Sequence, residues 1–203
     1  GNNLYAGLGG GGVFISSDSG FTWQARNNGI QFGGAYIFSL TSRNDSLFAG
    51  GFGEVCFSSD SGNNWSLLNL NLGFGDYVLS LVMKDAYVFA GVGHGTNNGV
   101  YRKLLNGNIW SETSNGMPVN AGVNGFAVDN NNLFAATDSG VYISSDNGDN
   151  WSFSGNGIPA GLIVKSIIYN NGYLIAGTTD GVFYSSDSGN SWNSSSGLPL
   201  NST

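Results

Sequence analysis

The chain has 203 residues, enough for one large domain with a sizeable core, and its six basic and thirteen acidic side chains give a net charge of −7. This balance argues against a nucleic-acid partner, because binding through phosphates needs a clustered basic patch. No apolar run approaches the roughly 20 residues that cross a bilayer, so membrane insertion is not expected. The single cysteine excludes an internal disulfide and a thiolate zinc site, and we expect no metal and no cofactor.

Five tryptophans divide the chain into repeats. They lie 42, 45, 41 and 41 residues apart, and a fixed period of this length is typical of repeat proteins. We expect the repeats at approximately 1–29, 30–70, 71–115, 116–156 and 157–203, within a single domain. Each holds short runs rich in Val, Ile, Phe and Tyr, which in the last repeat are 163–169, 173–178, 182–186 and 192–195. Four such runs per repeat predict an all-β fold, a β-propeller of about five four-stranded antiparallel blades.

The first repeat is incomplete. It begins near Asn3 in its second strand, whereas the later repeats have all four strands, so nineteen strands are expected where five blades need twenty. Natural sheets avoid unpaired edges and exposed apolar faces. We therefore expect these residues to be a segment of a larger propeller in a longer chain, or else to associate through the incomplete first blade.

The most specific motif lies between the third and fourth strands of a repeat and reads S-S-D-x-G-x-x-W. A short carboxylate accepts backbone N–H groups within its own turn, glycine adopts the left-handed conformation, and tryptophan packs its large face against the blade. The residues with these structural roles are Asp18, Gly20 and Trp23, then Asp60, Gly62 and Trp65, then Asp146, Gly148 and Trp151, and finally Asp187, Gly189 and Trp192.

This motif resembles the Asp-box, or BNR repeat, of sialidase-like propellers, and the resemblance covers nearly the whole chain. It implies a propeller, and it favours the non-catalytic type of secreted bacterial proteins, with an extracellular or cell-surface location in the bacterial envelope. Asp-boxes also occur in sialidases and xyloglucan-degrading hydrolases. The third copy has Leu105 in place of the aspartate, which a turn-stabilising role tolerates more readily than a catalytic or metal-binding one.

Catalysis is the alternative hypothesis, as a glycoside hydrolase, a sialidase-like enzyme or a fragment of one. The sialidase resemblance requires three convergent arginines, but Arg26, Arg43 and Arg102 fall on an outer strand, at the end of an inner strand and on a third strand. Glycoside hydrolysis needs two carboxylates about 5 to 10 Å apart. The candidates on one propeller face are Glu54, Asp76, Asp138 and Asp180.

The connections between repeats, and those between second and third strands, emerge together on that face, where propellers usually bind. Aromatic residues beside glycines suit a sugar ring or a partner's side chain, and they also suit packing between blades. The candidate ligand-binding residues are Phe32, Tyr36, Phe74, Tyr77 and His94. The favoured function is a non-catalytic binding module of a secreted or cell-surface protein, with a protein or glycan as its partner.

Overall fold

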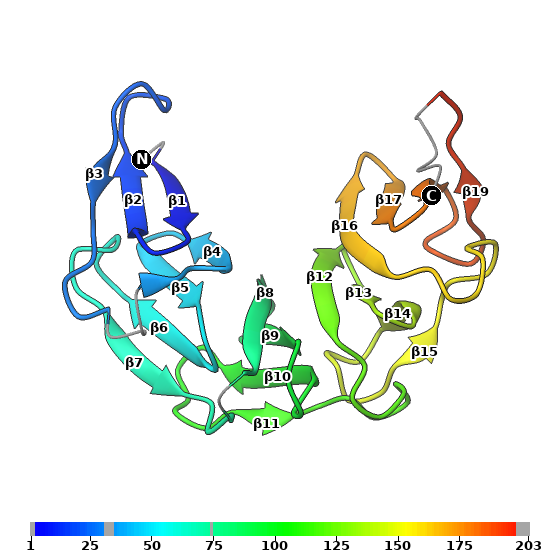
Figure 1. The fold of residues 1–203 in the computed structure, drawn as a ribbon, viewed down its shortest axis with the longest axis horizontal. Coiled ribbons are helices and arrows are strands. Elements are labelled where there is room, and N and C mark those ends of the chain that lie inside the picture. Colours follow the sequence, from blue (N-terminus) through cyan, green and yellow to red (C-terminus); the bar gives the residue numbers. More distant parts are fainter. Residues whose placement is uncertain (1–2, 31–34, 74, 198–203) are drawn as a thin grey trace.

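The computed structural model describes residues 3–30, 35–73 and 75–197. These residues form nineteen strands in five antiparallel sheets (Figure 1). The first sheet has three strands and the others have four each. The all-β architecture and the incomplete first blade are therefore confirmed. Among the same residues, no helix has the length and apolar character needed to cross a membrane.

Each sheet is an up-and-down meander that we call a blade, numbered in chain order. Blade 1 consists of β1 (Leu4–Leu8), β2 (Gly12–Ser16) and β3 (Gln24–Ala25). Blade 2 consists of β4 (Ser39–Arg43), β5 (Ser46–Gly50), β6 (Glu54–Ser58) and β7 (Ser66–Asn69). Blade 3 consists of β8 (Tyr77–Lys84), β9 (Tyr87–Gly93), β10 (Gly99–Leu104) and β11 (Ser111–Glu112). Blade 4 consists of β12 (Val123–Val128), β13 (Leu133–Thr137), β14 (Gly140–Ser144) and β15 (Ser152–Phe153), and blade 5 of β16 (Val164–Asn170), β17 (Tyr173–Thr178), β18 (Gly181–Ser185) and β19 (Asn193–Ser194).

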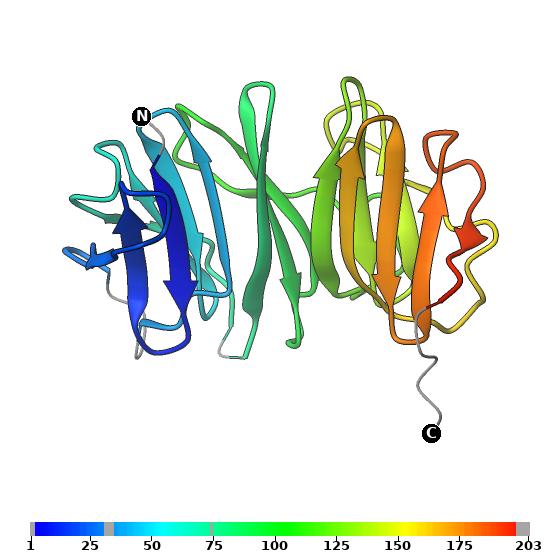
Figure 2. The ribbon, with the colours of Figure 1, turned by 90° about the horizontal axis from the view of Figure 1, so that it is seen from above.

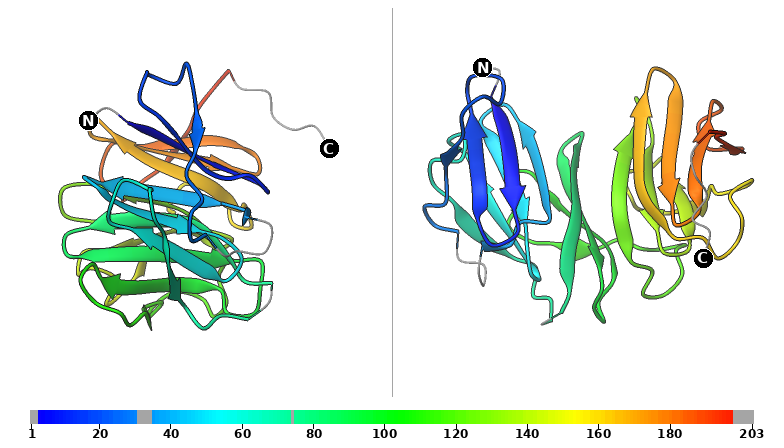
Figure 3. Two further views of the ribbon diagram at one scale, coloured as in Figure 1. Left: turned by 90° about the vertical axis from the view of Figure 1, so that its left-hand side faces the viewer. Right: turned by 45° about the horizontal axis from the view of Figure 1, so that its top comes forward.

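The five blades form an open arc with blades 1 and 5 at its two ends (Figures 1 and 3). The strands run across the thickness of the arc, so their connections gather on two faces (Figure 2). We call the face with the β5–β6, β9–β10, β13–β14 and β17–β18 connections, and the links between blades, the loop face. The opposite face carries the turns between third and fourth strands, and we call it the turn face.

The apolar core lies between neighbouring blades. Successive residues of a strand point to opposite sides, and in β5 this places Leu47 against blade 1 and Phe48 against blade 3. Both side chains are buried. The second strands β5, β9 and β13 are buried at almost every position. The alternation explains this, because each of their blades has a neighbouring blade on both sides.

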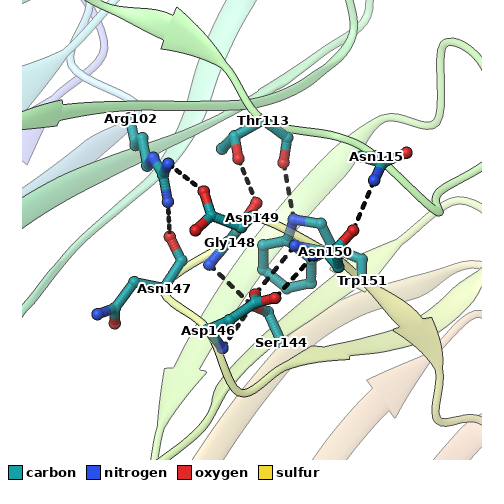
Figure 4. A network of polar contacts seen from close by, with 10 residues as sticks. All are labelled: Arg102, Thr113, Asn115, Ser144, Asp146, Asn147, Gly148, Asp149, Asn150 and Trp151. Carbon is teal, nitrogen blue, oxygen red and sulfur yellow. Dashed lines mark hydrogen bonds and ion pairs between the residues drawn. The ribbon is translucent and has the colours of Figure 1, made fainter.

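The S-S-D-x-G-x-x-W turns, which we call serine–aspartate turns, join blades 2, 4 and 5 to the blade before each of them. Nε1 of Trp151 donates to the carbonyl of Thr113 in blade 3 at 2.7 Å (Figure 4). The Thr113 hydroxyl in turn donates to the carbonyl of Gly148 inside the turn (Figure 4). Trp65 and Trp192 donate in the same way to Arg26 and Ser154 of their preceding blades, at 2.8 and 2.6 Å.

Trp23 differs because the described residues contain no blade before blade 1. Its Nε1 donates to Gly20 of its own turn at 3.0 Å, and 40% of the residue is exposed. Trp65, Trp151 and Trp192 are 5%, 3% and 4% exposed. The blade against which a turn tryptophan packs is thus the preceding one, a detail that the repeat pattern by itself does not specify.

Candidate functional site

Five aromatic rings from blades 2 and 3 meet on the loop face. Tyr36 and Phe38 precede β4, Phe52 lies between β5 and β6, Tyr77 begins β8, and His94 follows β9. The rings of Phe38 and Tyr77 are stacked, with centroids 5.1 Å apart and planes at 12°. Phe52 stands edge-on to both, at 5.0 and 4.9 Å. We call these five residues the aromatic cluster.

The cluster has a packed base and an exposed rim. Tyr36 lies 5.3 Å from Phe52, and His94 lies 5.5 Å from Tyr77, both measured between ring centroids. Tyr36 and Phe38 are 42% and 37% exposed, and His94 is also exposed. Phe52 and Tyr77 are only half-buried. The cluster therefore offers solvent a continuous aromatic surface.

Main-chain hydrogen bonds hold these rings in place. Ile37 N donates to the carbonyl of Leu8 in blade 1 at 3.1 Å, and Phe38 N donates to that of Gly50 at 2.9 Å. Val78 N donates to Gly51 at 3.0 Å, beside an isolated bridge between Phe52 and Tyr77. The backbone beneath the cluster is thus tied to the sheets of blades 1, 2 and 3.

A buried carboxylate orders the loop that carries His94. Asp76 is 1% exposed and accepts hydrogen bonds from Gly73 N at 2.8 Å, Asn97 N at 3.0 Å and Asn97 Nδ2 at 2.7 Å. Burial alone would raise the pKa of Asp76, but the hydrogen bonds from Asn97 and Gly73 outweigh it and lower the pKa below its usual value. A Cβ at Gly95 would meet the Asp76 carboxylate at 1.8 Å, and His94 itself has φ of 69°. Asp76 is therefore a structural anchor of the loop.

The structure brings together three of the five candidate binding residues, namely Tyr36, Tyr77 and His94. Phe32 and Phe74 lie outside the described residues. Sequence reasoning missed Phe38, which it placed in an inner strand, and Phe52. The sequence Gly51-Phe52-Gly53 carries the same signal of an aromatic beside glycines, but it connects two strands within a blade, whereas the aromatic residues predicted from this signal belong to the links between blades.

Several of the catalytic candidates form hydrogen bonds or ion pairs within the fold. The Asp76 carboxylate accepts hydrogen bonds from Gly73 and Asn97. The Asp138 carboxylate accepts a hydrogen bond from Asn124 at 2.9 Å. Arg43 donates to the carbonyl of Asp85 at 2.7 Å, and Arg102 is paired with Asp149. In the described part of the chain, no group of three or more His, Cys, Asp or Glu side chains could hold a metal ion.

The aspartates of the serine–aspartate turns use their carboxylates inside the turn. Asp18 accepts hydrogen bonds from the hydroxyl and the backbone N of Thr22, at 2.6 and 2.9 Å, and from Ser16 Oγ at 2.7 Å. These bonds lower the pKa of Asp18 to about 2. The equivalent bonds lower the pKa of Asp60 and Asp187 to about 2, and they also lower that of Asp146 (Figure 4).

The third turn, which lacks the aspartate, uses a lysine instead. Lys103 occupies the position of the first serine and is buried. Its Nζ donates to the carbonyls of Leu104 and Gly107 at 2.8 Å each, and to that of Leu105 at 3.4 Å. The polarity of the turn is thus reversed: a cation donates to carbonyls where serine and aspartate accept from N–H groups. Burial lowers the pKa of Lys103.

A groove of about 610 Å³ lies between blades 3 and 4, and its lining shares no residue with the aromatic cluster. Arg102 in its wall is already engaged with Asp149 and with the carbonyl of Asn147 (Figure 4). The charged group best able to fix a ligand there is therefore already paired, and we place the candidate site at the aromatic cluster.

The family model described as "DUF6242 beta propeller domain" matches residues 76–203. No curated protein matches the chain by sequence. Among solved structures, an ancestral GH74 enzyme is similar with a TM-score of 0.79 and 20% identity, over 98% of this chain and 30% of that one.

Two further structures share the fold. One is the extracellular domain of a protein described as a hybrid two component system from B. thetaiotaomicron, with a TM-score of 0.69 and 17% identity over 90% of this chain and 25% of that one. The other is YCF48 bound to D1 peptide, with a TM-score of 0.71 and 14% identity over 98% of this chain and 65% of that one. The chain thus spans about a third or less of the first two proteins. At these identities the likeness shows the fold alone.

Proposed function

Because the chain belongs to the family of DUF6242 beta propeller domains, we propose that it is a non-catalytic binding module whose aromatic cluster recognises a protein or a glycan. The fold supplies a rigid arc, and the loop face is where its repeats differ most from one another. In an otherwise repetitive molecule, the residues that depart from the repeat are the best candidates for a specific task.

The observation that carries the proposal is the contact of five rings, several of them exposed, at one place on the loop face. Tyrosine and other aromatic side chains are enriched at the centres of interfaces, where they bury large areas at a small cost in conformational entropy. The same rings can stack on the apolar face of a sugar. The fixed backbone beneath the cluster lowers the cost of binding further, because the rings are already ordered.

The printed descriptions of similar structures support this proposal by analogy. YCF48 is described as bound to a peptide, and the B. thetaiotaomicron structure is described as an extracellular domain. We extend both features to this chain as proposals, with an extracellular or cell-surface location in a bacterium. We further propose that the serine–aspartate turns are Asp-boxes, since the carboxylates hydrogen-bond within their own turns.

A carbohydrate-active enzyme is the second candidate, favoured by the likeness to a GH74 enzyme. Hydrolysis would need two carboxylates across the substrate. With Asp76 occupied, the remaining candidates on the loop face are Glu54, Asp138 and Asp180. Release of sugar from a polymer by the chain, lost on replacing one of these three, would favour the enzyme over the binding module.

A binding screen with matched variants tests the main proposal. The full chain is screened on a glycan array and in pull-downs, and each hit is titrated against Tyr36→Ala, Phe38→Ala and the control Phe21→Ala. Phe21 is an exposed aromatic in a turn of the turn face. We expect at least tenfold weaker binding for the first two variants and unchanged binding for the control. Equal binding by all three variants would contradict the proposed site.

A further inference from the structure

The turn between β10 and β11, on the turn face, carries apolar residues at positions where the other turns are polar (Figure 1). We call residues 103–110 the lysine turn. Leu104 and Ile109 lie at two positions of the motif, and Leu105 takes the place of the aspartate. The residues that match Leu104 in the other turns are Ser17, Ser59, Ser145 and Ser186, and those that match Ile109 are Thr22, Asn64, Asn150 and Ser191.

The apolar side chains of the lysine turn are exposed. Leu104 is 50% exposed and Ile109 is 80% exposed, although their blade has a neighbouring blade on both sides. Together with Tyr87 they line a groove of about 370 Å³. Ligand pockets begin at roughly 300 Å³, so the groove has room for one or two side chains of a partner. Exposed apolar groups beside such a groove are typical of an interaction surface.

The lysine turn is ordered, but it does not make the contact that joins other blades. The indoles of Trp65, Trp151 and Trp192 donate to carbonyls of the preceding blade. The buried Nε1 of Trp110, by contrast, has no hydrogen-bond partner within the described part of the chain. Lys103 holds the turn from inside through the carbonyls of Leu104 and Gly107. The turn therefore presents its apolar side chains in a fixed arrangement.

A positive charge lies beside the groove. Lys103 contributes to the lining and is 4% exposed, and among the described residues it has no ion-pair partner. Arg102 also contributes to the lining, and it is paired with Asp149. The serine–aspartate turns carry a carboxylate where this turn has Leu105. The local charge therefore favours a ligand with a carboxylate over a ligand with an amine.

We propose that the lysine turn binds a peptide segment of a partner protein, one that carries an apolar side chain beside a carboxylate. The apolar side chain enters the groove lined by Tyr87, Leu104 and Ile109, and the carboxylate faces the positive charge of Lys103. A stable dimer buries about 800 Å² on each partner, whereas this apolar patch is confined to one turn and one adjoining ring. A short segment therefore suits the surface better than a second copy of the chain.

This partner is additional to the ligand of the aromatic cluster. The groove shares no residue with that cluster and lies on the opposite face of the arc. Each surface can therefore be altered without touching the other, and the experiment below uses this independence.

Selection of peptides on the full chain tests the proposal. A phage-displayed library of random peptides is selected on the wild type, and the enriched sequences are synthesised with a fluorescent label and titrated by fluorescence anisotropy. We expect one group of enriched sequences to share an apolar residue next to Asp or Glu. Changing that acidic residue to its amide should weaken binding about tenfold at low salt and remove most of the salt dependence.

Variants of the turn locate the site that these peptides bind. The double variant Leu104→Ser with Ile109→Asn receives residues that other turns have at the same positions, so it is expected to fold, which circular dichroism and the melting temperature check. We expect it to bind the peptides at least tenfold more weakly. Phe21→Asn is the matched control, because Phe21 is an exposed apolar residue of the first turn. Phe21→Asn and Tyr36→Ala should both bind the peptides as the wild type does.

Several outcomes would overturn the proposal. One is that every enriched peptide binds the double variant and the wild type equally well, and another is that no sequence with an acidic residue is enriched. Analytical ultracentrifugation of the wild type and the double variant adds a third. Association of the wild type that the double variant abolishes would assign the surface to a second copy of the chain instead of a peptide.

Discussion

The two faces of the arc are built from the same repeats but use their polar and aromatic groups in opposite ways. On the turn face, the tryptophan and aspartate of each serine–aspartate turn form hydrogen bonds within the turn or with the preceding blade, as Trp151 and Asp146 do (Figure 4). On the loop face, Tyr36, Phe38 and His94 remain exposed beside one another. The comparison indicates that the repeated residues of the turn face stabilise the fold, whereas the non-repeated residues of the loop face are available to bind a ligand.

The largest expected effect tests the stabilising role of the turn face. Trp151→Ala removes a buried indole and its hydrogen bond to Thr113, and we expect it to lower the free energy of unfolding by about 3–5 kcal/mol. Trp23→Ala is the matched control, since the same motif position is exposed in blade 1. In dilute solution we expect it to cost less than about 1 kcal/mol. Equal losses in urea unfolding would refute the role assigned to the preceding blade.

Within the aromatic cluster, we expect the half-buried rings to contribute to stability and the exposed rings to contribute mainly to binding. Tyr77→Ala deletes a half-buried ring that contacts Phe38, Phe52 and His94, and we expect a loss of about 2–3 kcal/mol. Tyr36→Ala, at the exposed rim, should change stability by no more than about 0.5 kcal/mol. Thermal melts of both variants measure the contrast, and a large shift for Tyr36→Ala would assign that ring to the core.

The lysine turn offers a chemical comparison within the turn face. Lys103→Met keeps the aliphatic stem but removes three donated hydrogen bonds, and it also removes the cost of burying a charge. The two effects oppose each other, and we expect a net loss of about 1–2 kcal/mol. The double variant Lys103→Ser with Leu105→Asp rebuilds a serine–aspartate turn and should recover part of this loss. If Lys103→Met were as stable as the wild type in urea, the bonds to the carbonyls would contribute nothing net.

The smallest effect per site is a pH dependence. Folding lowers the pKa of Asp18, Asp60 and Asp187 from 3.8 to about 2. Their contribution is present above about pH 4 and is lost as the pH falls through 2. Asp146→Asn should cost about 1 kcal/mol near neutral pH, because the amide accepts fewer strong bonds, and it should reduce the loss of stability in acid. Identical acid unfolding curves for the variant and the wild type would contradict this.

The sequence predicted the fold well because its signals are periodic. The tryptophan spacing and the four apolar runs of each repeat place every strand, and they identify the missing first strand of blade 1. Contacts between blades were less visible, since the acceptor of the Trp151 indole lies 38 residues earlier, in another repeat. Likewise, the sequence reveals that Leu105 replaces an aspartate, but only the conformation of the turn brings Lys103 back onto its carbonyls.

The candidate site could be predicted in part. Tyr36, Tyr77 and His94 stand out because they interrupt the repeat beside glycines or in an insertion. Phe38 resembles a core residue, since it immediately precedes an inner strand, and its exposure depends on how that strand begins. Asp76 was a candidate for catalysis at the sequence level, and only the structure places the backbone and side chain of Asn97 against its carboxylate.

The open arc also has a consequence for how the molecule unfolds. Substantial contacts between strands of different blades join neighbours only, such as β4 with β8 and β12 with β16. Such an assembly behaves as a linear array, in which local opening requires breaking one boundary at an end but two in the middle. Amide protons should therefore exchange with solvent first in blades 1 and 5 and last in blade 3, so that the chain frays from its ends while its centre stays protected.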